Sequence, residues 1–200
     1  MIRIIKKIPH NITIACSGGI DSMVFVDFLL KGKRKVKLAY FNHDTFYSQT
    51  AQNFVQDFAT KNNLKLLIGK VQGVKGRRSM EEFWRDERYH FLNKINSDFT
   101  ITCHHLDDCV ETWVMSSLHG QGKLIPYKRN SNVYRPFLMT SKKTIKKYAE
   151  AKNVKWVEDP SNQKCEYSRN YVRNIMMSHI LKINPGIRTT IRKKLIENYL

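Results

Sequence analysis

The chain has 200 residues, of which 42% are hydrophobic and 11% aromatic, so it can bury a sizeable core and is not an intrinsically disordered protein. Its 35 Lys and Arg residues outnumber its 17 Asp and Glu residues, which gives a formal net charge of +18. Residues 121–200 carry 18 of the basic and 5 of the acidic residues, so a polyanionic partner is expected mainly there. A basic surface that contacts only water is the alternative.

We expect a cytoplasmic protein without membrane association. No stretch approaches the roughly 18 apolar residues that span a bilayer, and residues 1–7 lack the apolar core of a signal peptide. The four cysteines form no CxxC pair, which favours reduced thiols. They are Cys16, Cys103, Cys109 and Cys165.

Strand-like and helix-like runs alternate over the first half of the chain. The expected strands are 11–16, 36–41, 64–68 and 99–103, and the helices between them are 22–30, 48–62 and 79–95. This alternation favours an α/β fold with a mostly parallel sheet and helices on both faces. In such sheets, ligands bind at the carboxyl ends of the strands.

The first strand is followed by the most informative segment, Ser17-Gly18-Gly19-Ile20-Asp21-Ser22. Its glycines permit positive φ and a close approach of backbone N–H groups to a ligand, and the helix start adds partial positive charge. The serine hydroxyls are further donors, and Asp21 is placed to hold a cation. We expect a phosphate or pyrophosphate site, although an ordinary strand-to-helix turn is the alternative. No Gly-Lys-Ser/Thr triplet follows, so this is not a Walker loop.

Ionisable residues follow the fourth strand. They are Cys103, His104, His105, Asp107, Asp108, Cys109 and Glu111. If a helix begins near Leu106, Asp107 and Glu111 share one face with Asp108 beside them. These groups could hold Mg²⁺ or transfer protons. Acidic residues that only stabilise a helix start are one alternative, and a zinc site, which lacks the usual spacing, is another. Trp113, Met115 and Leu118 of this helix are expected in the core.

The chain changes character after residue 119. Loops are expected at 120–122, 128–132 and 158–162, and helices at 141–152, 166–183 and 187–198, the last two separated by Pro185-Gly186. We expect residues 1–140 to form a nucleotide-binding core and residues 141–200 to form a basic helical extension.

These motifs, taken in order from about residue 12 to 173, resemble the tRNA(Ile)-lysidine synthetase family of ATP pyrophosphatases. Residues 17–22 resemble the pyrophosphate loop of that superfamily. The other matching segments are Glu82–Arg85 with Arg88-Tyr89, His104–Asp108 with Glu111-Thr112, Gly120-Gln121-Gly122, Arg135–Leu138, 158–162, and Arg169-Asn170 with Arg173. The chain differs after His43, where Asp44-Thr45-Phe46 replaces a leucine-arginine pair, and it ends before the C-terminal domains that most relatives carry.

The resemblance implies a ligase that uses ATP and Mg²⁺. ATP would adenylate carbon 2 of the wobble cytidine of tRNA(Ile) with a CAU anticodon, and the ε-amine of free lysine would then displace AMP. Asp21 and Asp108 are expected to hold Mg²⁺, with Asp107 next. A free lysine amine has a pKa near ~10.4 and must lose a proton to react. His105, Asp107 and Glu111 are the candidates for binding or deprotonating it.

The resemblance also implies a tRNA partner, and family members often form homodimers. Contacts with tRNA or another substrate are expected from Arg85, Arg88, Arg135, Arg169, Asn170 and Arg173, and further phosphate contacts from Lys142, Lys143, Lys146, Lys147, Arg192, Lys193 and Lys194. Salt bridges to Asp86 or Glu81 are the alternative role for Arg85 and Arg88. Four aromatic residues among these charges could stack an extruded base, although at least two are expected in the core. They are Tyr134, Trp156, Tyr167 and Tyr171.

Three other functions remain open from the sequence. A tRNA cytidine thiolase of the same superfamily would typically use a CxxC pair. A small-molecule ligase, such as a synthetase of NAD or GMP, would not need the basic C-terminal region. A shortened, non-catalytic RNA-binding protein would bind tRNA without releasing AMP.

Overall fold

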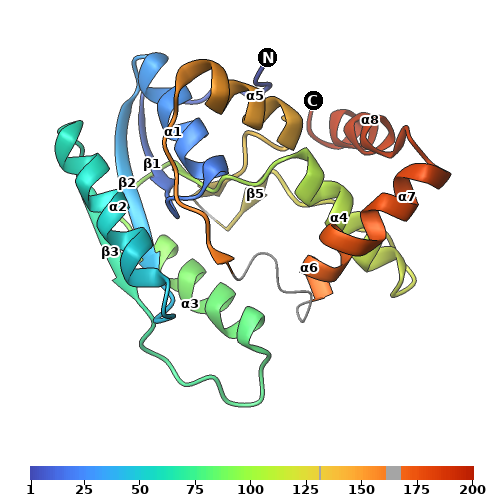
Figure 1. Ribbon diagram of the computed structural model, residues 1–200, viewed down its shortest axis with the longest axis horizontal. Coiled ribbons are helices and arrows are strands. Elements are labelled where there is room, and N and C mark those ends of the chain that lie inside the picture. The colour runs from blue at the N-terminus through green and yellow to red at the C-terminus, as the bar shows by residue number, and fades with distance from the viewer. Residues whose placement is uncertain (131, 161–167) are drawn as a thin grey trace.

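The computed structural model describes residues 1–130, 132–160 and 168–200 (Figure 1). Its strands are β1 (Asn11–Ala15), β2 (Lys35–Asn42), β3 (Leu66–Lys70), β4 (Thr100–Ile101), β5 (Lys128–Arg129) and β6 (Val133–Tyr134). Its helices are α1 (Ile20–Lys31), α2 (Ser48–Lys61), α3 (Met80–Lys94), α4 (Leu106–Ser117), α5 (Lys142–Lys152), α6 (Ser168–Tyr171), α7 (Met177–Ile183) and α8 (Ile187–Tyr199), with a π-helical segment η2 (Val172–Met176) between α6 and α7.

The described strands form one sheet in the order β3-β2-β1-β4-β6-β5. All neighbouring pairs are parallel except β5 and β6, which form an antiparallel hairpin at the edge. Because β1 lies between β2 and β4, the segments that follow β1 and β4 emerge side by side at the carboxyl edge. The expected mostly parallel α/β fold is confirmed.

Alternation along the strands divides the core between the two faces of the sheet. Ile14 of β1 and Leu38 of β2 belong to the cluster that packs against α1, α2 and α5, and the stacked rings of Phe25 and Phe137, 3.7 Å apart, lie in the same cluster. Ala39, one residue along β2, packs on the opposite face with side chains of α3. Helices therefore cover both faces, as expected.

The C-terminal helices form a third packed unit. Side chains of α4, α7 and α8 gather around Leu106, Val110, Ile191 and Leu195, all fully or almost fully buried. Figure 1 shows these helices together on one side of the sheet, whereas α5 lies beside α1. The expected division of the chain at residue 140 stays a prediction.

Local sequence explains where several helices begin. Ser79 caps α3 through a capping box with Glu82, whose backbone N–H donates to the Ser79 hydroxyl at 3.2 Å. The Ser141 hydroxyl accepts the Thr144 N–H at 3.3 Å and starts α5. Helix α4 begins at Leu106, where the sequence predicts it.

Several expectations were wrong in detail. The expected strand 99–103 is only two residues long, and the expected loop 128–132 contains strand β5 of the edge hairpin. The expected helix 166–183 is divided by η2, and its residues 166 and 167 lie outside the described residues. Leu118 is 66% exposed, because α4 ends at Ser117 and the chain turns away from the core there, whereas Trp113 and Met115 are partly buried against it.

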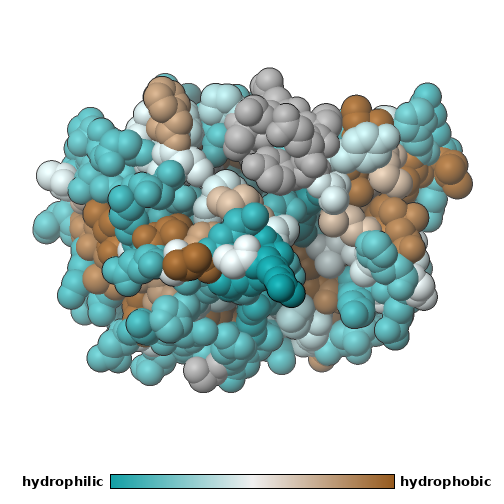
Figure 2. Space-filling view, turned by 90° about the horizontal axis from the view of Figure 1, so that it is seen from below, coloured by the Kyte–Doolittle hydropathy of each residue, from teal (hydrophilic) through white to brown (hydrophobic). Residues whose placement is uncertain are grey.

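Among the described residues, no helix has both the length and the apolar character needed to cross a bilayer. Figure 2 shows a mostly hydrophilic face with separate hydrophobic patches toward both ends of the molecule. Ile183, at the end of α7, is 86% exposed.

Candidate active site

The segment 17–22 forms a compact turn that leaves the start of α1 open. Gly18 has φ +79° and Gly19 is the N-cap residue. The Ser22 hydroxyl donates to the Gly19 carbonyl at 2.9 Å and lies 3.3 Å from the Ser17 hydroxyl. No described side chain caps the first N–H groups of α1, so these donors are available to an anion.

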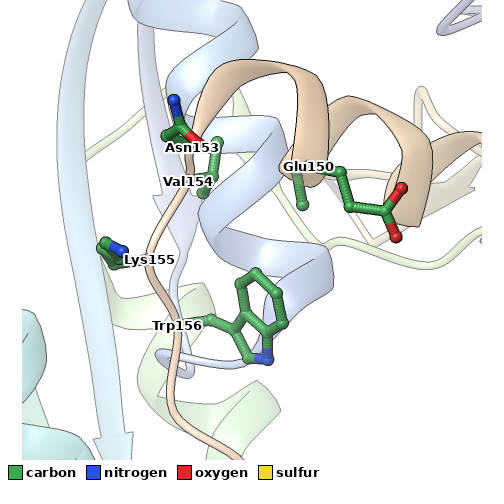
Figure 3. A pocket seen from close by; sticks show the side chains of 6 residues that line it. Glu150, Asn153, Val154, Lys155 and Trp156 are labelled. Carbon is green, nitrogen blue, oxygen red and sulfur yellow. The ribbon is translucent and has the colours of Figure 1, made fainter.

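A distant segment passes directly over this turn. The Val157 N–H donates to the Gly18 carbonyl at 3.0 Å, and a Cβ on Gly18 would lie 3.0 Å from a methyl carbon of Val157. Glycine is therefore needed at position 18 both for its positive φ and for this close approach. Figure 3 shows the segment around Trp156 running past α1 after the end of α5. The surface hollow there, of about 320 Å³, is lined by residues 149, 150 and 153–156 and does not include the turn at 17–22.

Asp21 is held by two cationic or polar partners. The Lys142 ammonium lies 2.6 and 2.8 Å from its two carboxylate oxygens, and His105 Nε2 lies 3.6 Å from Oδ1. Burial alone would raise the pKa of Asp21, but His105 and Lys142 outweigh it and hold the pKa below its ordinary value. The sequence analysis placed Lys142 only among the phosphate-binding lysines and missed this contact.

His105 joins the turn at 17–22 to helix α4. It is the N-cap residue of α4, and its backbone N–H donates to Asp108 Oδ2 at 2.9 Å while its Nδ1 faces the Asp108 N–H at 3.4 Å. Burial would lower the pKa of His105, but the charges of Asp108 and Asp21 raise it above its ordinary value. The structure thus brings Asp21, His105 and Asp108 together, as the sequence analysis expected.

Asp107 has a different set of partners. Its Oδ2 accepts the backbone N–H of Lys142 at 2.7 Å, and its Oδ1 accepts Arg188 Nε at 2.7 Å. Asp107 therefore connects α4 to the start of α5 and to α8. Asp107 and Glu111 lie four residues apart on α4, which begins at Leu106 as expected, but they contact different arginines. Their expected roles stay a prediction.

Asp108 and Glu111 instead share Arg173. The Arg173 guanidinium donates to both oxygens of Glu111 at 2.8 Å and to Asp108 Oδ1 at 3.2 Å. Arg169 Nε lies 3.4 Å from Glu111, and its NH2 group donates to the Thr112 hydroxyl at 2.7 Å. Burial would raise the pKa of Asp108, but the neighbouring His105 and other cationic groups hold it far below its ordinary value. These contacts leave both carboxylates nearly enclosed.

Other predicted arginines gather near His104. Arg135 is 2% exposed and donates to the Pro126 carbonyl at 2.7 Å and to the Tyr89 hydroxyl at 2.9 Å. Burial, followed by the charges of neighbouring arginines, lowers the pKa of Arg88, whose Nε has no partner among the described residues. Burial and the same arginine charges lower the pKa of His104 to about 3. This cationic cluster beside the α4 carboxylates suits a substrate phosphate or carboxylate.

The remaining predicted contacts differ in how far they are exposed to solvent. Arg85, Lys143, Lys146, Lys147 and Lys193 are exposed, whereas Asn170 is half-buried. The Tyr134 ring stacks on the Phe99 ring with 4.0 Å between their centroids, so one face of Tyr134 is already occupied. Tyr171 is 48% exposed. Tyr167 lies outside the described residues.

Asp21 and Asp108 offer chemistry that fits Mg²⁺. Asp21 Oδ1 lies 3.6 Å from His105 Nε2 and Asp108 Oδ2 lies 3.6 Å from His105 Nδ1, so the imidazole lies between the two carboxylates. Mg²⁺ is usually held by one or two carboxylates together with substrate phosphates, and so a complete protein cage is not needed. The described residues contain no group of three His, Cys, Asp or Glu side chains arranged for a metal ion.

The sequence matches the PP-loop domain family over residues 3–180, and the chain belongs to this family. Among curated proteins, it is 34% identical to the tRNA(Ile)-lysidine synthase of Persephonella marina over 197 residues, covering 90% of this chain and 44% of the relative. It is 29% identical to that of Haemophilus ducreyi, covering 92% of this chain and 45% of the relative. The chain thus spans about half the length of these relatives.

Solved structures confirm the fold. The U34-tRNA thiolase NcsA from Methanococcus maripaludis superposes with a TM-score of 0.75 at 19% identity, covering 96% of this chain and 74% of that one. The NH3-dependent NAD synthetase from Campylobacter jejuni gives 0.51 at 13% identity, covering 96% and 86%. Shared architecture at such identities does not define a reaction.

Proposed function

We propose that this chain is an ATP-dependent ligase that joins lysine to carbon 2 of the wobble cytidine in tRNA(Ile) with a CAU anticodon. The proposal rests on one observation. His105 lies between the open start of α1 and the carboxylates of α4, with its ring nitrogens 3.6 Å from Asp21 and from Asp108. The similarity to tRNA(Ile)-lysidine synthases supports the choice of substrate.

In the first proposed step, the oxygen on cytidine carbon 2 attacks the α-phosphorus of ATP, and the bond to pyrophosphate breaks. The N–H groups at the start of α1, with the hydroxyls of Ser17 and Ser22, stabilise the charge that develops on pyrophosphate. Asp21 and Asp108 would hold Mg²⁺, whose chemistry is to neutralise phosphate charge.

In the second proposed step, the ε-amine of lysine attacks carbon 2, and AMP leaves with the oxygen. The amine must lose a proton, and His105 is the proposed acceptor because its imidazole lies between Asp21 and Asp108, whose charges raise its pKa and make it a stronger base. Arg88 is the proposed partner of the lysine carboxylate or of an RNA phosphate, since its Nε has no acceptor among the described residues.

The cysteines give little support to the thiolase alternative. Burial raises the pKa of Cys16, Cys103 and Cys109 above that of an ordinary thiol, which is the opposite of what a sulfur nucleophile needs. Cys165 lies outside the described residues.

The test is one assay with purified protein, ATP, Mg²⁺, radiolabelled lysine and an unmodified tRNA(Ile) transcript with the CAU anticodon. We expect label in the tRNA together with AMP release. AMP without label would indicate a different nucleophile. Binding of the tRNA without AMP release would instead support a non-catalytic RNA-binding protein and overturn the proposal.

A further inference from the structure

Lys142 occupies the place where a divalent cation would bind Asp21. Its ammonium donates to both oxygens of that carboxylate, at 2.6 and 2.8 Å. The two residues belong to different elements, since Asp21 lies in the first turn of α1 and Lys142 is the first residue of α5. This contact therefore sits beside the open N–H groups that receive phosphate.

The backbone of Lys142 is fixed, but its side chain is free to move. Asp107 accepts the Lys142 backbone N–H at 2.7 Å and is itself held by Arg188. The Lys142 and Asp21 side chains are 33% and 31% exposed, and ion pairs that water reaches are usually weak. A lysine ammonium on a flexible four-carbon stem can leave such a pair at little cost.

An ammonium and a divalent cation repel each other at this distance, so they compete for Asp21. Once the ion has taken the carboxylate, a polyphosphate bound at the start of α1 would offer the Lys142 ammonium another anionic partner. The backbone of Lys142 would stay anchored to Asp107 while its side chain changes partner.

We propose that Lys142 alternates between two anionic partners. In the free protein it neutralises Asp21, and when Mg²⁺ and ATP bind, it releases Asp21 and pairs with the polyphosphate, which it holds as pyrophosphate leaves. The inference rests on the proposed use of ATP at this site. Asp107 is then a positioning residue that acts through the Lys142 backbone.

The first test measures Mn²⁺ binding to the free protein by electron paramagnetic resonance, without nucleotide. Lys142→Met removes the competitor, so Mn²⁺ affinity should rise by about fivefold, as expected for one partly screened charge. Lys142→Arg should leave the affinity close to that of the wild type. Lys152→Met is the matched control, because it removes the same charge from an exposed position about 15 Å along α5 and should change nothing.

The second test measures binding of inorganic pyrophosphate in the presence of Mg²⁺ by calorimetry. Lys142→Met should weaken it by about tenfold, and Lys142→Arg should restore most of the affinity. Circular dichroism confirms that each variant is folded. A rise in Mn²⁺ affinity together with a fall in pyrophosphate affinity supports the proposed alternation of Lys142. Unchanged affinities, or a rise for Mn²⁺ without a loss for pyrophosphate, overturn it. A wild-type protein that binds neither pyrophosphate nor ATP would instead defeat the proposed function.

Discussion

The turn after β1 takes its shape largely from its own six residues, whereas the carboxylates of α4 depend on cations from far along the chain. The Ser17 and Ser22 hydroxyls close the turn, with one distant hydrogen bond from Val157. Apart from His105, the partners of the α4 carboxylates lie between 35 and 81 residues away in sequence. Substitutions in the first region should therefore act mainly on phosphate chemistry, and those in the second also on the fold.

Asp21→Asn should have the largest effect, because Asp21 connects the turn at 17–22 with His105 at the start of α4. It removes the charge that is proposed to hold Mg²⁺, so AMP formation should fall by at least about 100-fold. Affinity for tRNA should stay nearly unchanged. Asp27→Asn in the same helix is the control, because Asp27 pairs with Lys31 and lies outside the site. If Asp21→Asn forms AMP at the wild-type rate, the turn at 17–22 does not have the role proposed for it.

Glu111→Gln tests the long-range region. It weakens the two hydrogen bonds from Arg173 at a carboxylate that is 4% exposed, and because Arg173 is 38% exposed, the expected loss of unfolding free energy is about 2 kcal/mol. Urea denaturation measures it. Glu150→Gln, at an exposed position, should lose almost nothing. A second substitution, Arg173→Gln, should add little if the two residues act as a pair, and additive losses would contradict that pairing.

Gly18→Ala tests how far the turn depends on its distant neighbour. Both positive φ and the contact with Val157 oppose the new methyl group, so stability should fall by about 1–2 kcal/mol. Gly76→Ala is the matched control, because Gly76 also has a positive φ of +60° but an added Cβ would have no atom within 4 Å. Its stability loss should therefore come from backbone strain alone and amount to about 1 kcal/mol. Equal losses in the two variants would mean that the Val157 contact has no energetic effect.

Mild acid should lower the stability of the fold through its buried histidines. Burial, followed by the charge of Arg88, lowers the pKa of His43 to about 4, so between pH 6.5 and 4 the unfolded chain binds the additional proton. Stability should therefore fall as the pH drops through this window, by about 1 kcal/mol for this half-buried group. The free energy of unfolding, measured with urea, should differ less between pH 7 and pH 5 in His43→Gln than in the wild type. Part of the difference should remain, because the pKa of His104 is also lowered. An unchanged difference would exclude His43 as its source.

Features encoded locally were predictable from the sequence. The alternating runs predicted the parallel sheet, and the glycines with flanking hydroxyls predicted an open turn before α1. The start of α4 at Leu106 also followed from local pattern. The edge hairpin was missed because strands of two residues carry no periodic signal.

The partners of the carboxylates were not predictable. Helical spacing places Asp107 near Glu111 and also Asp108 near Glu111, and only the packing of neighbouring helices decides which pair works together. Arg173 selects the second pair, while α5 and α8 engage Asp107. Lys142 was missed for the same reason, since nothing near it in sequence shows that its ammonium reaches Asp21.

The hydrogen bond between Gly18 and Val157 has a consequence for the order in which the protein matures during synthesis. A ribosome makes the N-terminal end first, so the turn at Gly18 emerges early, but the strand-like segment that covers it is made more than 130 residues later. The sheet that holds the turn also needs β4, which is made in between. A nascent chain that has not yet exposed Val157 therefore carries the turn at 17–22 without the segment that covers it, and full nucleotide affinity should be acquired only after residue 157 has emerged.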